Sequence, residues 1–459
     1  MAPPEAIRSS LSQRYEKEIT HTAYVSRVFL IVLQCAANIL IPDHNAEAFV
    51  YVVDRNNTTI ADKFISTLLG GFVRWDAQYF MHIAKYGYTY EHSLAFFPFY
   101  PFLGSIIAKA LAPFLYFMSI DSLLLISFIV INTFIFKQTS LVLFRLTCLF
   151  FNQETAYVAA RIFCFNPASV FFSAPYTETV FSFLSFTGMH NLVMWYKEKK
   201  SLIAVLVPIL LSAITRSNGV LNVGFLVFLY ICLALKGDFK VKVICALKII
   251  GSITICLSGF VYFIIYSRGL FCTGSINVPI SRDLQQQAQK EHYVLPYAWT
   301  NQLRPWCNFL KLPYTYVQSY YWNVGFLKYF QLKQAPNFLL ALPILYIVIS
   351  SCIEHFCINF LKRRNRKIFT FEGDSPNDDL WQPRLNVFYA HALFLSVFCL
   401  FFVNVQISTR MLCSASPVFY WICSFQAYKS QVLRKVIRFY ILGYFVIGTV
   451  MFCNFLPWT

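Results

Sequence analysis

Charged side chains are scarce in this sequence of 459 residues, because Asp, Glu, Lys and Arg together make up only 13% of it. A soluble globular domain carries roughly twice that share. Hydrophobic residues make up 58% and aromatic residues 19%, and long apolar runs alternate with short polar connections. Runs of this length cross a bilayer as helices. The sequence therefore predicts an all-α polytopic membrane protein and excludes an ordinary soluble domain.

Several sequence motifs of soluble enzymes are also missing. The chain has no DxD, GxSxG, P-loop or GxGxxG in a usable context, which removes support for a nucleotide-binding, serine-hydrolase or Rossmann protein. Its 14 cysteines are scattered singly, without a CxxC or a histidine at ligand spacing, so no metal site is predicted. Cys272 and Cys307 fall in one polar loop and could pair if that loop faces an oxidising compartment.

The formal net charge of +17 comes from Lys and Arg clustered between the apolar runs. This pattern indicates membrane topology and gives no reason to invoke nucleic acid. Residues 1–22 are polar and basic and are expected to form a cytoplasmic tail. The first span then places residues 42–92 on the lumenal side, where Asn56 and Asn57 begin two overlapping glycosylation sites.

The rest of the chain is expected to form a single integral membrane domain, residues 1–459, with about ten to twelve membrane helical segments. Residues 267–336 form the largest polar segment and are expected in the lumen, whereas 362–384 form a cytoplasmic loop that is first basic and then acidic. Four apolar runs lie between 94 and 196, although the charge pattern requires an odd number of crossings. We therefore expect the run broken by Asn166 and Pro167 to be partial or re-entrant.

Residues 201–235 are too long for one span and are flanked by lysines at both ends. A helical hairpin with its tip at residues 215–219 is the favoured interpretation, and a single long helix is the alternative.

This topology places eight ionisable residues from separate connections on the lumenal side. They are Arg74, Asp76, His82, Glu91, His92, Glu178, Arg216 and Arg410. An inverting transfer of a sugar from a lipid-linked phosphate needs one carboxylate to take a proton and cations to bind the leaving phosphate. The residues available are sufficient for that reaction.

Simpler roles compete with the catalytic ones. Asp76 could cap the interfacial helix that begins beside it, because Asp is a favourable N-cap residue. Glu91 and His92 are interpreted as a solvated interfacial pair, since no second ligand pair stands at helical spacing.

The remaining candidates also have structural alternatives. Arg216 and Arg410 stand at expected hairpin tips, from which their side chains could reach lipid headgroups. Glu178 begins an apolar helix and could be an acid favoured by the helix dipole.

Five sequence blocks, spread from end to end of the chain, are similar to one known family. They are RWDAQYF…IAKYGYTYEHSLAFFPFYP at 74–101, ITRSNG at 214–219, YWNVGFLKYF at 321–330, LKQAPNFLLA at 332–341 and CNFLPWT at the C-terminus. The chain resembles the eukaryotic GPI mannosyltransferase II family. The resemblance implies a multi-pass glycosyltransferase of the GT-C type in the endoplasmic reticulum membrane. The implied reaction moves mannose from dolichyl phosphate mannose, in α-1,6 linkage, onto the first mannose of a glycosylphosphatidylinositol (GPI) precursor.

The resemblance also implies that the catalytic acidic residue is Asp76, in the first lumenal loop, with Arg74 and Trp75 as the rest of its motif. Relatives often follow the WDA triplet with an acidic residue and a histidine, whereas this chain has Gln78 and Tyr79. No function is therefore carried over to those two positions.

The predicted mechanism uses Asp76 to deprotonate the 6-hydroxyl of the acceptor while Arg216 or Arg410 binds the dolichyl phosphate. Nothing in the sequence demands a nucleotide, a cofactor or a metal. The full set of expected substrate-binding residues is Arg74, Trp75, Glu91, His92, Glu178, Arg216 and Arg410.

Three alternatives remain open. Another transferase that uses dolichyl phosphate mannose would differ only in its acceptor. A lipid-sugar flippase or transporter predicts inverted repeats, which the sequence does not show. A non-catalytic subunit predicts that Asp76 is dispensable. The expected partners are the lipid-linked donor, the GPI precursor and membrane lipid, and a small membrane accessory subunit stays open.

Overall fold

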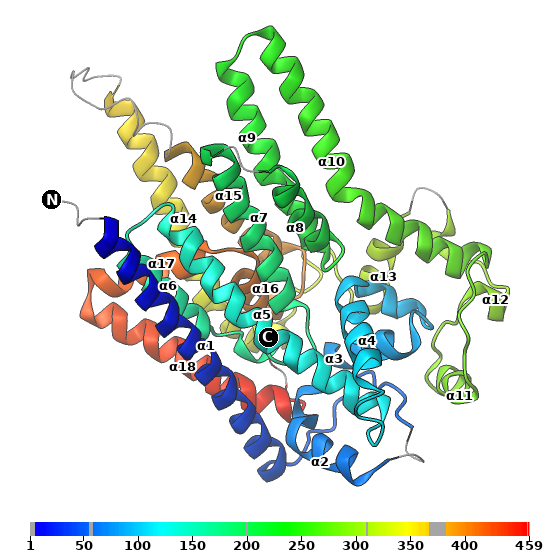
Figure 1. The fold of residues 1–459 in the computed structure, drawn as a ribbon. Coiled ribbons are helices and arrows are strands. Elements are labelled where there is room, and N and C mark those ends of the chain that lie inside the picture. Colours follow the sequence, from blue (N-terminus) through cyan, green and yellow to red (C-terminus); the bar gives the residue numbers. More distant parts are fainter. Residues whose placement is uncertain are drawn as a thin grey trace.

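The computed structural model describes residues 5–54, 58–198, 201–308, 311–366, 382–456 and 458, and within these ranges it contains helices and no strand (Figure 1). The α-helices are α1 (Glu5–Leu40), α2 (Ile60–Leu69), α3 (Asp76–Tyr86), α4 (Phe99–Leu111), α5 (Ile120–Cys148), α6 (Gln153–Cys164), α7 (Glu178–Glu198), α8 (Ile203–Ala213), α9 (Val223–Lys236), α10 (Phe239–Arg268), α11 (Arg282–Glu291), α12 (Tyr297–Thr300), α13 (Pro313–Tyr321), α14 (Ala335–Arg366), α15 (Gln382–Phe401), α16 (Ser408–Ala415), α17 (Val418–Lys429) and α18 (Gln431–Cys453).

Short helical turns connect them. These are η1 (Gly70–Phe72), η2 (Glu91–Ala95), η3 (Ser169–Phe172), η4 (Ser217–Asn222), η5 (Gly269–Thr273), η6 (Pro305–Cys307), η7 (Leu332–Gln334) and η8 (Val405–Ile407).

Among the described residues, six helical segments are long and apolar enough to cross a membrane by length and composition. They are Ser10–Leu40, Ile120–Cys148, Ser217–Lys236, Phe239–Thr273, Leu332–Ile358 and Gln431–Cys453. Three shorter apolar helices, α4, α8 and the main part of α15, accompany them. The chain is thus a multi-pass membrane protein, which confirms the all-α prediction.

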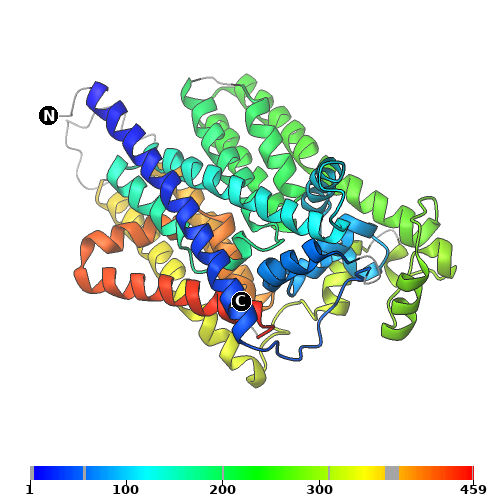
Figure 2. The same ribbon diagram turned by 60° about the horizontal axis from the view of Figure 1, so that its bottom comes forward.

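Helix α5 lies at the centre of the bundle and packs against α1, α4, α6 and α7. Helix α1 also packs against α18, so the first and last helices of the chain lie against each other (Figure 2). Helices α9 and α10 form a pair that extends from one end of the molecule, and the segment from α11 to α13 lies near the opposite end of α10 (Figure 1). This arrangement leaves the short turns η4 and η8 and helix α16 between the long helices.

Two interruptions in the apolar runs agree with the expectations from the sequence. Helix α6 ends at Cys164, and the Asn166 side chain accepts a hydrogen bond from the Ala168 N–H and donates one to the Phe163 carbonyl. Pro167 follows directly and could not continue the α6 hydrogen bonds. The 201–235 run is broken between α8 and α9, which excludes a single long helix. At this break Gly219 approaches the Ser212 carbonyl so closely that a side chain would not fit.

A buried arginine on α1 holds the first interruption in place. The Arg27 guanidinium donates to the carbonyls of Cys164 and Ser169 at 3.1 and 3.0 Å, and to the Ser173 hydroxyl at 2.9 Å. It also lies 3.9 Å from the centre of the Phe136 ring. The buried positive charge of Arg27 is thus stabilised by backbone carbonyls that have no helical partner where α6 ends.

We predict that Arg27→Met lowers the free energy of unfolding by about 2–4 kcal/mol, because it removes several charge-assisted hydrogen bonds and leaves buried carbonyls unpaired. The measurement is thermal unfolding of the purified protein in detergent. Arg161→Met is the control, since Arg161 is exposed on α6 and lies 3.5 Å from the Tyr157 hydroxyl. Equal losses for the two variants would contradict a special role for Arg27.

Candidate functional site

A cavity of about 860 Å³ opens among α3, η4, α13, α15 and α16. Its charged lining residues come from positions far apart in the sequence and are Glu47, Asp76, Glu178, Arg216 and Arg410. A larger group of apolar and aromatic side chains lines the rest. The cavity is therefore polar at one end and apolar elsewhere, a combination that suits an amphipathic ligand.

The polar end contains a chain of four alternating charges. The Arg410 Nη1 donates to the Asp76 Oδ2 at 2.8 Å and lies 3.9 Å from the Glu178 Oε1. Glu178 in turn forms an ion pair with Arg216. Burial opposes the charge on Arg410, but the carboxylates of Asp76 and Glu178 outweigh burial and raise the pKa of Arg410 above its ordinary value. Two acids and two bases thus neutralise one another inside the cavity.

The backbone around Asp76 is fixed by its neighbours. Asp76 is the first residue of α3, and Trp75 before it has φ 54° and ψ −127°, a conformation that costs energy for any residue with a side chain. The Asp76 N–H donates to the Tyr176 hydroxyl at 3.0 Å. Trp75 occupies the N-cap position, so the alternative in which Asp76 caps the helix is not what the structure shows. The carboxylate is directed toward Arg410 instead.

Arg74 supports this strained turn from outside the cavity. Its guanidinium donates to the Cys453 carbonyl at 3.0 Å and to the Asn38 side chain at 2.9 Å, and it pairs with Asp43 at 2.9 Å. It also faces the Phe455 ring at 4.6 Å. Arg74 therefore connects the turn before α3 to both ends of the chain.

A model for the family described as Mannosyltransferase (PIG-V) matches residues 16–459. The chain belongs to this mannosyltransferase family. Membership confirms both the resemblance found in the sequence and the prediction of a glycosyltransferase.

Curated relatives of the family match over nearly their whole length. GPI mannosyltransferase 2 of Drosophila melanogaster is 34% identical over 462 residues, covering 96% of this chain and 100% of the relative. GPI alpha-1,6-mannosyltransferase 2 of Homo sapiens is 31% identical over 500 residues, covering 96% of this chain and 98% of the relative.

Among solved structures, the Archaeoglobus fulgidus oligosaccharyltransferase tethered to an acceptor peptide aligns with a TM-score of 0.45 at 11% identity. The alignment covers 94% of this chain and 55% of the archaeal chain, so this family member spans about half of that chain's length.

Five of the residues expected from the sequence meet at the cavity. Trp75, Asp76, Glu178, Arg216 and Arg410 all line it. Arg74, Glu91 and His92 are absent from the lining of this cavity, and the structure gives them other contacts. The glycosylation candidates Asn56 and Asn57 lie outside the described residues. Within the described ranges, no three His, Cys, Asp or Glu side chains gather as a metal ion would require.

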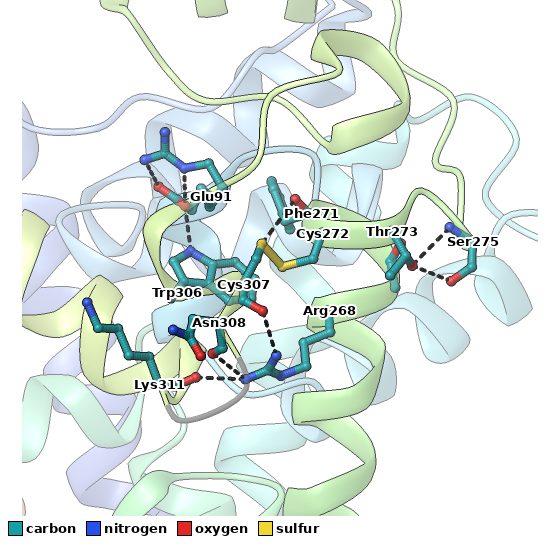
Figure 3. The surroundings of a disulfide bond; sticks show 12 residues. Glu91, Arg268, Phe271, Cys272, Thr273, Ser275, Trp306, Cys307, Asn308 and Lys311 are labelled. Carbon is teal, nitrogen blue, oxygen red and sulfur yellow. Dashed lines mark hydrogen bonds and ion pairs between the residues drawn. A yellow bond between two sulfur atoms is a disulfide. The ribbon is translucent and has the colours of Figure 1, made fainter.

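Glu91 is the buried anchor of the segment that contains α13. Its carboxylate accepts hydrogen bonds from Arg304 Nε at 2.6 Å and Nη2 at 2.8 Å, from Trp306 Nε1 at 2.7 Å and from the Tyr321 hydroxyl at 2.6 Å. Cys307, next to Trp306, forms a disulfide with Cys272 in η5, the turn that follows α10 (Figure 3). The expectation of a solvated pair at 91–92 is wrong, because both side chains are buried.

Helix α13 transmits this anchoring to the cavity. Trp322, directly after Tyr321, lines the cavity and lies 5.9 Å from the rings of Tyr79 and Phe96. At the other end of α13, the Tyr314 hydroxyl lies 2.8 Å from the Ser217 hydroxyl, beside Arg216. One wall of the cavity is therefore positioned by a carboxylate that never reaches the cavity itself.

Two kinds of site residue are not predicted by the sequence. Tyr176 orients the Asp76 backbone, and Tyr79 and Trp322 form part of the aromatic wall. Tyr176 stands two residues before Glu178, and that spacing was the only local signal available. Trp322 lies in the sequence block at 321–330 that resembles the family, but the pattern of that block does not distinguish a cavity wall from loop packing.

We predict that Glu91→Gln destabilises the protein by about 3–5 kcal/mol, because it removes a fully buried carboxylate that pairs with the partly buried Arg304 guanidinium. Thermal unfolding and the accessibility of Cys272 and Cys307 to alkylation after mild reduction measure the effect. Glu291→Gln, at an exposed surface pair with Lys290, is the control and is expected to change little. A Glu91→Gln variant as stable as this control would show that the anchor is unnecessary.

His92 provides a pH-dependent test of burial. Burial lowers the pKa of His92 to about 3, and its ring lies 4.5 Å from that of Tyr293. The folded protein therefore keeps this histidine neutral while the unfolded chain binds a proton below about pH 6.5. Stability is fully present above that pH and falls as the pH decreases toward 3, by at most about 1.4 kcal/mol per pH unit for each such histidine.

We expect His92→Phe to flatten this acid-side loss, because phenylalanine fits the aromatic surroundings and binds no proton. The measurement is the unfolding midpoint between pH 7.5 and 5 in detergent. His292→Asn is the control, since His292 is exposed and its left-handed backbone suits asparagine. His82, whose pKa burial also lowers to about 3, is left in place and accounts for part of the remaining slope. An unchanged slope in His92→Phe would contradict the burial argument.

Proposed function

We propose that this protein is an inverting α-1,6-mannosyltransferase that moves mannose from dolichyl phosphate mannose onto the first mannose of a GPI precursor. The observation that carries the proposal is the meeting of Asp76 with Arg410, at 2.8 Å, in a cavity that also contains Arg216 and Glu178. A carboxylate that accepts a proton and cations that bind a leaving phosphate are thus within reach of one substrate. The family and the names of its relatives supply the sugar and the acceptor.

The chemistry assigns one role to each charge. Asp76 takes the proton of the acceptor 6-hydroxyl while that oxygen forms a bond to C1 of the donor mannose. The bond between C1 and the phosphate oxygen breaks, and its electron pair stays on the phosphate. Arg216 and Arg410 stabilise that added charge, so no general acid is needed for the leaving group. Attack opposite the phosphate inverts the β-linked donor to an α product.

An apolar wall of the cavity suits the lipid chain of such a donor. Phe394, Phe398 and Phe402 follow one another at four-residue spacing on and just after α15, with ring centres 6.1 and 5.4 Å apart. All three line the cavity, while Phe394 and Phe402 are also 52% and 41% exposed at the surface. A wall that faces both the cavity and the surroundings of a membrane helix would let an isoprenoid chain remain in lipid.

The disulfide supports a lumenal location for the cavity. Cys272 and Cys307 pair within the segment that leads to α13, and α13 lines the cavity. Disulfides persist in oxidising compartments such as the lumen of the endoplasmic reticulum. We therefore infer a cytoplasmic N-terminus, a crossing by α1 and a site that faces the lumen of the endoplasmic reticulum. The predicted accessory subunit stays a prediction.

The family match favours a transferase over a lipid-sugar flippase or a non-catalytic subunit. A transferase that uses the same donor with a different acceptor is separated by the lipid that accumulates when the protein is missing.

We predict that the wild-type protein restores surface GPI-anchored proteins in cells blocked at the second mannose, and that Asp76→Asn does not. Loss of a general base is expected to reduce the rate by about 10²–10⁴-fold. The one-mannose lipid intermediate is measured beside the surface anchors, and expression of each variant is checked. Asp43→Asn is the matched control, because Asp43 is an exposed carboxylate that pairs with Arg74 outside the cavity.

Failure of the wild-type protein to restore anchors would refute the acceptor. Full activity of a well-expressed Asp76→Asn would refute the base, and Glu178 would then be the carboxylate to test next within the cavity.

A further inference from the structure

The carboxylate proposed as the base is already engaged by a cation. The Asp76 Oδ2 accepts a charge-assisted hydrogen bond from the Arg410 Nη1 at 2.8 Å, and the two side chains are 25% and 16% exposed. Both line the cavity, so a ligand can reach the pair. An acceptor hydroxyl approaching Asp76 must compete with a guanidinium, which is the stronger partner for a carboxylate.

The contact between Asp76 and Arg410 is built differently from the structural ion pairs of this protein. Arg304 donates hydrogen bonds to the Glu91 carboxylate through two nitrogens, and Trp306 and Tyr321 donate two more. Arg410 holds Asp76 through Nη1, whereas its Nε has no hydrogen-bond partner among the described residues. A contact through one nitrogen is more easily exchanged than a fork-shaped one.

Arg410 also has a second anion within reach. Its Nη1 lies 3.9 Å from the Glu178 Oε1, the same oxygen that pairs with Arg216. If the Arg410 guanidinium moves away from Asp76, it therefore still has the Glu178 carboxylate as a nearby negative charge. An anionic phosphate that entered between Arg216 and Arg410 would gain two cations, and Asp76 would lose one.

We infer that the phosphate of the lipid-linked donor releases the base, by taking Arg410 from Asp76, and that the acceptor binds productively only afterwards. This inference rests on the proposed function and adds to it an order of binding. In the resulting cycle the donor phosphate binds Arg216 and Arg410, the freed Asp76 accepts the acceptor hydroxyl, and transfer follows. Departure of the lipid phosphate lets Arg410 return to Asp76.

The order of binding predicts a measurable coupling between two ligands. The probes are a short-chain dolichyl phosphate, which has no sugar to transfer, and a GPI-precursor analogue that carries one mannose. The Kd of the acceptor analogue is measured on the full-length protein in nanodiscs, with and without saturating dolichyl phosphate. We expect binding about 10-fold tighter with the phosphate, and by linkage an equal gain for dolichyl phosphate when the acceptor is present.

Three variants assign the coupling to residues. Arg410→Gln cannot hold Asp76 by charge, so it should bind the acceptor equally well with and without dolichyl phosphate. Asp76→Asn should behave in the same way in binding while it fails in transfer. Arg216→Gln is the matched control, because the Arg216 guanidinium forms its ion pair with Glu178 and not with Asp76. The Arg216→Gln variant should need a higher concentration of dolichyl phosphate for saturation. Once saturated, it should still bind the acceptor analogue about 10-fold more tightly than without dolichyl phosphate. Each variant is first compared with the wild type by thermal unfolding.

Two results would overturn the inference. The first is an acceptor Kd of the wild-type protein that is the same with and without dolichyl phosphate. The second is a folded Arg410→Gln variant in which dolichyl phosphate still tightens acceptor binding by the full 10-fold. A mannosyl-transfer assay on the same samples separates this failure from failure of the proposed function. Transfer without coupling refutes only the order of binding, whereas coupling without transfer refutes only the proposed reaction.

Discussion

The ion pair between Asp76 and Arg410 joins side chains that are 334 positions apart, so it forms only when the fold brings α3 and α16 together. An ionised side chain is costly inside an apolar helical bundle unless an opposite charge or several hydrogen bonds compensate it. Here each charge is compensated by the next, from Asp76 through Arg410 and Glu178 to Arg216. These four side chains carry no net charge together, which lowers the cost of keeping them in the cavity.

The buried Arg27 and Glu91 and the partly buried Arg74 are compensated in a different way and serve a different purpose. Arg27 uses backbone carbonyls that a broken helix leaves free, and Arg74 uses carbonyls and an exposed carboxylate near both ends of the chain. Glu91 is surrounded by four donors. These groups have their hydrogen bonds filled by protein atoms and fix the backbone, whereas Arg410 keeps a partly unfilled guanidinium beside the cavity. The number of protein partners thus separates groups that hold the fold from groups free to meet a ligand.

Much of the fold could be predicted from the sequence, because a membrane span is recognised from the length and apolar composition of one continuous segment. Apolar length, basic connections and the Asn166–Pro167 break predicted the helical architecture and its interruption, and these signals need no knowledge of distant residues. The site was predictable only in part. Asp76 was expected at the site from its place in a family motif. Glu91 and His92 were expected at a solvated interface, but they are buried because the segment around residues 293–321 packs against them. Burial of a charged pair depends on such distant partners, and local sequence does not contain them.

The two positions where this chain departs from its relatives' motif have separate physical explanations. Gln78 is buried and accepts the Tyr51 N–H at 3.1 Å while its amide donates to the Val73 carbonyl at 2.9 Å, so it joins the preceding loop to the turn before α3. Tyr79 lies on the cavity side, stacked between Phe49 and Phe96 at 4.3 and 4.4 Å. A neutral amide and an uncharged ring add no charge beside Asp76, whose carboxylate is paired with Arg410. Gln78 therefore positions the backbone before α3, while Tyr79 contributes an aromatic ring to the cavity wall beside Asp76.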